Sequence, residues 1–251
     1  MADILSIMNL SKHFDGVVAL DNFSLSLEHR SIVGIIGPNG AGKTTMFNVV
    51  SGFLSPENGE IRYKDINLSG MAKHRIAGTG ISRTFQDLRL IMKLTVLENV
   101  MLAMKDQKGE NIFHVLFNPG GVKKAEAENR DKAVSLLEYV ALQEKINDPA
   151  ENLSYGQQKL LSLACCLATD AELLLLDEPV AGIHPEIIDK ILNIIKELKE
   201  KGKTVVMIEH NLDAVARVSD RIVVMDEGRK VAEGKHDVII NDPRVLEAYL
   251  E

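Results

Sequence analysis

The chain has 251 residues, enough for one large domain or two lobes with an ample core. Its 45% of apolar and 26% of charged residues are ordinary for a soluble globular protein. The formal net charge of −7 disfavours a broad nucleic-acid-binding face, and aromatic residues, at 4% with no Trp, are too scarce for stacking platforms on single-stranded nucleic acid.

The sequence shows neither a membrane-spanning segment nor the features of a secreted chain. No apolar run approaches the roughly 18 residues that a membrane helix needs. The start, Met1-Ala2-Asp3-Ile4, lacks the basic and apolar segments of a signal peptide. The adjacent Cys165 and Cys166 lie in an apolar helical pattern, so we expect structural burial in a reducing cytosol.

The first part of the chain leads into a glycine-rich motif. Residues 4–33 alternate as in strands, and the β-branched run at 31–36 predicts a buried strand. After the motif, Thr45–Val50 continues as a helix. Between them, every position of G-x-x-x-x-G-K-[ST] is filled, by Gly37, Pro38, Asn39, Gly40, Ala41, Gly42, Lys43 and Thr44.

A strand, a glycine loop and a helix N-terminus in this order predict an anion site. Glycines let successive backbone N–H groups point inward, and the helix dipole adds positive potential. Lys43 would reach the β- and γ-phosphates of a nucleotide, and the Thr44 hydroxyl would ligate Mg²⁺. The alternative is a chance match in a Gly-rich turn.

The middle of the chain is expected to be largely helical. Before it, the pattern predicts a turn at 56–60 and strands at 61–63 and 81–86. From about residue 95 to 169 the apolar spacing is that of helices, interrupted by a loop at Asn118–Gly121.

Strand and helix alternate after residue 170. We expect strands at 173–176, 203–208 and 222–225, an amphipathic helix at 186–201 that ends at Gly202, and a helix at 212–218. The pattern predicts an α/β core interrupted by a helical lobe.

Two carboxylates, Asp177 and Glu178, end the apolar run Leu173–Leu176. This places them at the carboxyl edge of the sheet, where ligands sit in open α/β folds. Asp177 suits Mg²⁺ coordination through water, and Glu178 would face the γ-phosphate and polarise the attacking water. Alone, such a strand end is often a solvated acid; the phosphate loop in the same chain favours the functional interpretation.

A second helix start has anion-binding character. In Leu153–Gln158, Ser154 is a candidate N-cap, and Gly156 exposes backbone N–H groups at the start of an apolar helix. The residues alone leave open a plain capped helix.

In their order, these segments resemble the ABC-type ATPase subunits: the phosphate loop, Gln86 after a strand, Leu153–Gln158, Asp177-Glu178 and a later His210. Within that family the chain is most similar to the ATP-binding subunits of branched-chain amino-acid importers. The similarity lies in Tyr155, in Ala181–Pro185, in Asp242–Leu250 and in an extra loop around 108–124.

The resemblance implies a single ABC ATPase domain over residues 1–251 with a P-loop NTPase core. That core would be RecA-like, with a mixed sheet and antiparallel N-terminal strands, and would comprise residues 1–87 and 158–251. Residues 88–157 would form an inserted helical subdomain.

The resemblance also implies roles for single residues. Phe14 would stack on adenine, where the alternative is a core Phe, and Gly37–Thr45 would hold the triphosphate. Gln86 would touch Mg²⁺ or water and pass the nucleotide state to the helical lobe, where the alternative is a surface Gln. His210 would contact the γ-phosphate. The γ-phosphate of ATP held by the opposite subunit would be bound by Ser154, Gly156 and Gln157, and residues 180–184 would exchange contacts between subunits.

The implied activity is hydrolysis of ATP with Mg²⁺ by a peripheral protein on the cytoplasmic face of the cell membrane. Its partners would be a second ATPase subunit, identical or a paralogue, transmembrane permease subunits received near Gln86–Asn99, and indirectly a solute-binding protein, but no nucleic acid. Three other interpretations stay open: a urea or amide importer or lipopolysaccharide exporter ATPase, a non-transport ABC protein acting on nucleic acid or ribosomes, and an assembly scaffold ATPase. Three positions depart from the commoner residues of the family. Tyr155 stands where Gly is commoner, His184 where many relatives have Asp or Asn, and Cys165 where many have Arg.

Overall fold

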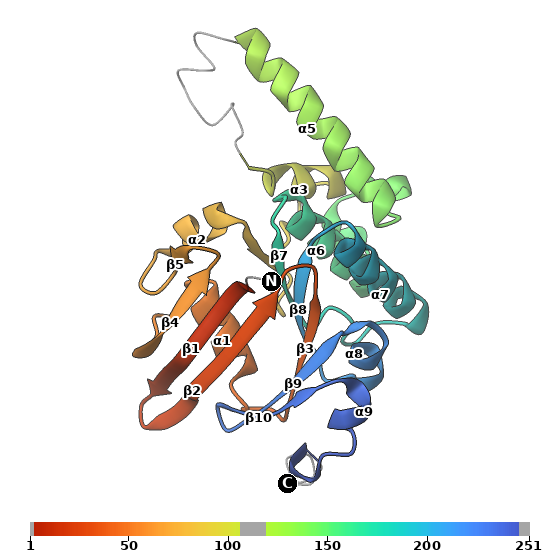
Figure 1. The fold of residues 1–251 in the computed structure, drawn as a ribbon. Coiled ribbons are helices and arrows are strands. Elements are labelled where there is room, and N and C mark those ends of the chain that lie inside the picture. The colour runs from red at the N-terminus through yellow and green to blue at the C-terminus, as the bar shows by residue number, and fades with distance from the viewer. Residues whose placement is uncertain (1–2, 106–118, 246–251) are drawn as a thin grey trace. The chain divides into compact units, whose positions relative to one another are not determined.

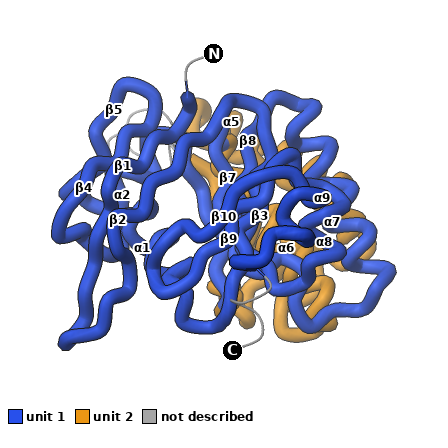
Figure 2. Tube along the Cα trace, turned by 60° about the horizontal axis from the view of Figure 1, so that its bottom comes forward, with its two compact units in different colours: residues 1–86, 171–251 blue, residues 87–170 orange. Residues whose placement is uncertain are grey.

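The computed structural model describes residues 3–105 and 119–245 (Figure 1). The chain forms two compact units, unit 1 from residues 1–86 and 171–251 and unit 2 from residues 87–170 (Figure 2). The resemblance placed the second boundary after residue 157, which lies inside helix α6 (Tyr155–Ala168), whereas unit 2 contains this helix whole.

Unit 1 begins with an antiparallel sheet in the order β2-β1-β4-β5. Its strands are β1 (Asp3–Phe14), β2 (Val17–Glu28), β4 (Asn58–Tyr63) and β5 (Ile66–Asn67). The turn expected at 56–60 is therefore shorter, because β4 already starts at Asn58. Gly59 makes this possible: a Cβ there would lie 2.6 Å from the carbonyl oxygens of Met8 and Asn9 on β1.

The second sheet of unit 1 has the order β10-β9-β3-β8-β7-β6. It is parallel except for β10 (Arg229–Gly234), which pairs antiparallel with β9 (Arg221–Asp226). The remaining strands are β3 (Ile32–Ile36), β6 (Ile81–Arg83), β7 (Leu173–Asp177) and β8 (Thr204–Ile208). Every residue of β3, β7 and β8 is buried, as expected for central parallel strands. The mixed sheet and antiparallel N-terminal strands that the resemblance implied are confirmed.

The parallel strands bring their carboxyl ends to one edge, where the chain leaves them for helices or loops. The helices of unit 1 in its described residues are α1 (Lys43–Val50), α2 (Lys73–Thr79), α7 (Pro185–Glu200), α8 (Leu212–Val218) and α9 (His236–Ile239). The sequence did not predict α2, α9, β5 or β10. The strand expected at 81–86 ends at Arg83, because the Thr84 hydroxyl, rather than a backbone carbonyl, accepts the N–H of Asp177 at 3.0 Å.

Unit 2 is helical, as its apolar spacing predicted. It contains α3 (Val96–Leu102), α5 (Pro119–Tyr139), α6, and the 3₁₀ turns η2 (Gln143–Lys145) and η3 (Ala150–Asn152). Helices α3, α5 and α6 pack on one another around fully buried Val100, Leu137 and Leu161. A capping box starts α3: Glu98 N–H donates to the Thr95 hydroxyl, and Thr95 N–H donates to the Glu98 carboxylate.

The prediction of a loop at Asn118–Gly121 is wrong for residues 119–121, the part that the structure describes. Pro119, Gly120 and Gly121 form the first turn of α5. Proline is tolerated there, because the first helical N–H groups have no intrahelical acceptor. Asn118 and most of the loop expected at 108–124 lie outside the described residues.

The adjacent cysteines behave as structural groups. Both lie on α6 as thiols rather than as a disulfide; Cys166 is buried, and desolvation raises the pKa of Cys165 to about 12. Such thiols are inert at neutral pH. None of the helices that the structure describes is long and apolar enough to cross a membrane.

Candidate nucleotide-binding and hydrolysis site

The phosphate loop connects β3 to α1 in a conformation that glycine alone permits. Gly37, Gly40 and Gly42 have φ of 149°, 87° and 91°. A Cβ at Gly37 would lie 2.0 Å from the Met225 carbonyl oxygen, and one at Gly42 would lie 2.3 Å from that of Ala19. The loop is therefore packed tightly between β9 and β2, and no side chain caps the N-terminus of α1. Such an N-terminus suits a bound anion.

Lys43 is folded back over this loop. Its ammonium is buried and donates to the carbonyl oxygens of Gly37 at 2.7 Å and Pro38 at 2.8 Å. Desolvation lowers the pKa of Lys43. The negative charges of Glu178 and Asp177 act in the opposite direction and offset this only in part. A phosphate at the N-terminus of α1 would give this cation an anionic partner. The neighbouring Thr44 is exposed, so its hydroxyl is accessible to a ligand.

Residues that follow three neighbouring strands meet in unit 1. Gln86 follows β6, Glu178 follows β7, and His210 comes after β8. The Gln86 amide nitrogen donates to the Glu178 carboxylate at 3.2 Å, and His210 Nε2 lies 3.0 Å from the other oxygen of Glu178. Glu178 has φ of 48°, an uncommon value for a residue with a side chain and one found at functional sites.

A cleft of about 250 Å³ in unit 1 unites these groups with the phosphate loop. Its lining comprises Val17, Val18, Ala19, Asn39, Gly40, Ala41, Gly42, Lys43, Thr44, Thr45, Gln86, Glu178 and His210. The candidate residues Gly37, Pro38 and Asp177 lie outside this lining; Asp177 is almost fully buried at the end of β7. The structure thus brings together most of the unit 1 residues that the sequence singled out.

Phe14 is not among the lining residues. It is 41% exposed, which excludes the alternative of a core Phe, and the Lys12 ammonium lies 5.3 Å from its ring centroid. The start of β2, at Val17–Ala19, lines the cleft instead. These three residues were missed, since short apolar residues after a turn carry no chemical signal.

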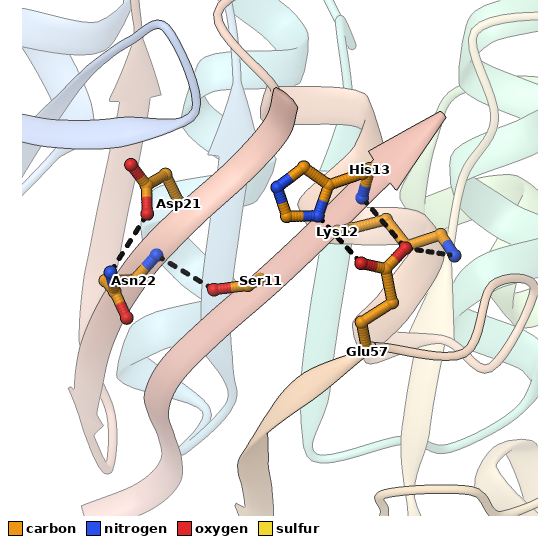
Figure 3. A network of polar contacts seen from close by, with 6 residues as sticks. All are labelled: Ser11, Lys12, His13, Asp21, Asn22 and Glu57. Carbon is orange, nitrogen blue, oxygen red and sulfur yellow. Dashed lines mark hydrogen bonds and ion pairs between the residues drawn. The ribbon is translucent and has the colours of Figure 1, made fainter. Parts of the chain in front are cut away.

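The strand that carries Phe14 is held by Glu57 (Figure 3). The Glu57 carboxylate lies 2.7 Å from His13 Nδ1 and also accepts from the His13 N–H and the Lys12 ammonium. These bonds lower the pKa of Glu57 to about 2, and the bond to the His13 side chain has the largest effect. Nearby, the Asn22 N–H donates to the Ser11 hydroxyl across β1 and β2, and the Asn22 amide donates to Asp21, its neighbour on β2. Hydrogen bonds and ion pairs therefore hold the β1–β2 hairpin, whose β2 start lines the cleft.

Arg83 is a second residue that the sequence did not single out. Its guanidinium donates to Asp177 Oδ2 at 2.9 Å, to Asn48 on α1 at 2.8 Å and to Ser51, the C-cap of α1, at 3.0 Å. It also lies over the ring of Phe85, the neighbour of Gln86, at 4.9 Å from the centroid. An Arg in a short predicted strand, Ile81-Ser82-Arg83, was the available signal.

The second candidate anion site begins α6 in unit 2. Ser154 is its N-cap: Gln157 N–H donates to the Ser154 hydroxyl at 3.4 Å, and Ser154 N–H donates to the Gln157 side chain at 2.9 Å. Ser154 and Tyr155 are exposed, and Gly156 is half-buried. The predicted cap is therefore present, and its side chain is accessible in the described chain.

The sequence matches the family model described as ABC transporter over residues 20–181, well over half of the chain. The chain belongs to the ABC transporter family. It is 40% identical over 248 residues to the high-affinity branched-chain amino acid transport ATP-binding protein LivG of Escherichia coli K12, covering 98% of this chain and 97% of that one.

Solved ABC cassettes have the same fold. A nucleotide-free ATP-binding cassette from an ABC transporter covers 100% of both chains, with a TM-score of 0.86 at 35% identity. A dimeric cassette in a post-hydrolysis state, bound to ADP and Pi, covers 92% of this chain and 98% of its own, with a TM-score of 0.78 at 27% identity. The chain is thus an ATP-binding subunit of an ABC transporter, whose ATP hydrolysis is coupled to transport.

Proposed function

We propose that this chain is the ATP-hydrolysing subunit that powers import of branched-chain or related hydrophobic amino acids through separate membrane permeases. The observation that carries the hydrolytic part is one cleft, lined by Gln86, Glu178 and His210 together with Lys43 and its neighbours in the phosphate loop. The cargo rests on similarity over nearly the whole chain to a subunit named for branched-chain amino acid transport.

The residues present fit a Mg²⁺ ion bound with the nucleotide. The exposed Thr44 hydroxyl, the Gln86 amide and the Asp177 carboxylate are oxygen ligands of the kind that hard cations prefer. Asp177 would act through water from behind the cleft, and the Arg83 bond holds one of its oxygens in place. When bound, the ion would neutralise charge on the β- and γ-phosphates.

Hydrolysis then requires a positioned phosphate and an oriented water. The N–H groups of the phosphate loop and the Lys43 ammonium hold the phosphates. Glu178 orients a water and accepts its proton as the water oxygen bonds to the γ-phosphorus and the bond to the β–γ bridging oxygen breaks. His210, 3.0 Å from Glu178, contacts the γ-phosphate, and Gln86 senses its presence.

A second subunit completes the site. The helix start at Ser154, Gly156 and Gln157, of which Ser154 is exposed, would bind the γ-phosphate of ATP held by an identical or paralogous partner. Residues 180–184 would exchange contacts with that partner. Loss of the γ-phosphate removes this bridge and weakens the interface. The nucleotide thus shifts the two subunits between an associated and a separated state. The solved dimer of a similar cassette supports such pairing. Permease subunits would dock near Gln86–Asn99 at the cytoplasmic face of the membrane.

Uptake measurements test the proposed cargo. Cells of the source organism that lack the gene should lose most uptake of radiolabelled leucine, isoleucine and valine. The parent chain should restore it, and the Lys43→Ala variant should not, because the cation that faces the phosphates is gone. The exposed α7 variant Lys196→Ala is the control. Unchanged amino-acid uptake with lost urea uptake, or with defective lipopolysaccharide export, would instead select one of the alternative cargoes.

A further inference from the structure

Glu209 is a buried carboxyl group to which the proposed mechanism assigns nothing. It directly follows β8 and is 1% exposed. One carboxylate oxygen accepts the N–H of Val180 at 2.7 Å, and the other accepts the N–H of His210 at 3.3 Å. Its own N–H donates to the Ile35 carbonyl on β3 at 3.2 Å. The backbone of Glu209 is thus bonded to the central sheet, while its side chain accepts N–H groups from two other segments.

Burying this group is costly. Desolvation, together with the nearby charge of Glu178, raises the pKa of Glu209 to about 7, and the backbone N–H bonds from Val180, His210 and Asn211 only partly offset the rise. An apolar side chain of similar volume would avoid this cost. Packing alone therefore does not account for a glutamate here, whereas satisfying backbone N–H groups of two loops does.

The two loops that Glu209 joins carry the proposed hydrolytic pair. Val180 lies two positions after Glu178, and His210 is the next residue after Glu209. His210 Nε2 lies 3.0 Å from the Glu178 carboxylate, and the Glu209 carboxylate bonds to the backbone of both loops that carry this pair. Glu178 also has the left-handed φ of 48°, so its loop needs tertiary contacts to keep this conformation.

We propose that Glu209 is a positioning residue: its carboxylate clamps the backbone at Val180 to the backbone at His210 and so sets the separation of Glu178 and His210 for hydrolysis. The inference rests on the proposed roles of Glu178 and His210. Through Val180, which begins the segment expected to contact a second subunit, the same clamp links the hydrolytic pair to that segment.

The first test replaces the carboxylate by groups that cannot hold both loops. In Glu209→Gln, an NH₂ group stands where one acceptor oxygen stood; Glu209→Asp keeps the charge but is one methylene too short. Both variants should lower kcat about 10- to 100-fold, the range expected for a small misplacement of reacting groups, and leave ATP affinity within about 2-fold. Either variant suffices if the other does not fold.

The matched control is Thr204→Val at the opposite end of β8. Thr204 is equally buried, and its hydroxyl accepts the backbone N–H of Arg30 at 2.9 Å, far along the strand from the cleft. This variant should lower the melting temperature and leave kcat unchanged. An equal fall of kcat in Thr204→Val and the Glu209 variants would overturn the proposal, because loss of stability alone would then explain it.

A double-mutant cycle separates positioning from a general structural role. In a His210→Ala background, Glu209→Gln should reduce kcat less than about 2-fold, since the pair it positions is already broken. Independent, multiplying losses, or an unchanged kcat in both single Glu209 variants, would contradict the proposal. If His210→Ala by itself leaves turnover intact, the proposed role of His210 fails and this inference falls with it; the single variant tells the two failures apart.

Discussion

The Arg83 guanidinium and the Asp177 carboxylate form a buried ion pair at 2.9 Å, with side chains 5% and 1% exposed. The pair joins the end of β6 to the end of β7, and further bonds from Arg83 reach Asn48 on α1 and Ser51 at its C-cap. One side chain therefore connects the helix that starts at the phosphate loop, the proposed metal carboxylate and the segment that leads to Gln86.

Removing Arg83 should destabilise unit 1 strongly. The Arg83→Met variant keeps much of the volume but leaves the Asp177 carboxylate buried without its cation, which typically costs about 3–5 kcal/mol. The control is Lys93→Met, which breaks an exposed pair with Glu151 and should cost less than about 1 kcal/mol. Chemical denaturation measures both. Equal, small losses would show that Asp177 does not depend on Arg83.

The raised pKa of Glu209 predicts a stability that falls with pH. Because the folded-state pKa is about 7 against an ordinary value of 4.5, the folded protein binds this proton more tightly than the unfolded chain does. The contribution is fully present below pH 4.5 and is lost as the pH rises through 7. Its size is about 3 kcal/mol, from the shift of the pKa at 1.36 kcal/mol per unit.

The measurement compares the parent with Glu209→Gln, which lacks this titration. Between pH 4.5 and 8 the free energy of unfolding of the parent should fall by about 3 kcal/mol relative to the variant, because the other titrating groups are shared. A constant difference across this range would show that the Glu209 carboxyl is not protonated preferentially in the folded state.

Much of the site was predictable because its signals are local. The phosphate loop is a continuous motif whose glycines the structure requires at Gly37 and Gly42, and the Asp177-Glu178 pair follows an unmistakable apolar strand. Gln86, Glu178 and His210 each follow a parallel strand, and the carboxyl ends of parallel strands lie at one edge of a sheet. Their proximity therefore follows from the strand assignment alone. The cap at Ser154 was likewise readable from the sequence.

What the sequence could not predict depends on contacts between distant residues. Arg83 is recognisable as important only once Asp177 and Asn48 stand beside it, and Glu209 only once Val180 does. Short elements such as β5 and α9 have too few residues for a period to emerge. At Pro119–Gly121, turn-forming residues predicted a loop, yet the same residues are compatible with the first turn of α5.

Action of Ser154 on the partner's ATP predicts a phenotype that depends on pairing. In Ser154→Arg, a bulky cation replaces the N-cap of α6, so dimer formation and turnover should be lost while the monomer still binds ATP. The control is Ser135→Arg at an exposed position on α5. Calorimetry measures binding, and light scattering measures the dimer. Loss of ATP binding by the folded Ser154→Arg monomer would show that this helix start acts on its own subunit.

Mixing two inactive variants extends this test. Ser154→Arg retains Lys43, and Lys43→Ala retains Ser154, so a mixed dimer of the two should contain one competent site at most. Turnover should therefore reappear on mixing, although neither variant turns over alone. No recovery, despite mixed dimers detected by light scattering, would argue against sites shared between subunits.

The role proposed for Glu178 is hydrolysis in a site that binds ATP independently of this carboxylate. The most direct measurement is ATP turnover together with ATP retention in Glu178→Gln, which keeps the shape of the side chain, beside Glu186→Gln at an exposed position on α7 as the control. We expect turnover to fall by about 10²–10⁴-fold, the contribution of a general base, with ATP retained in a dimer visible by light scattering. Full turnover in Glu178→Gln, or a loss of ATP binding that accounts for the fall, would contradict the claim.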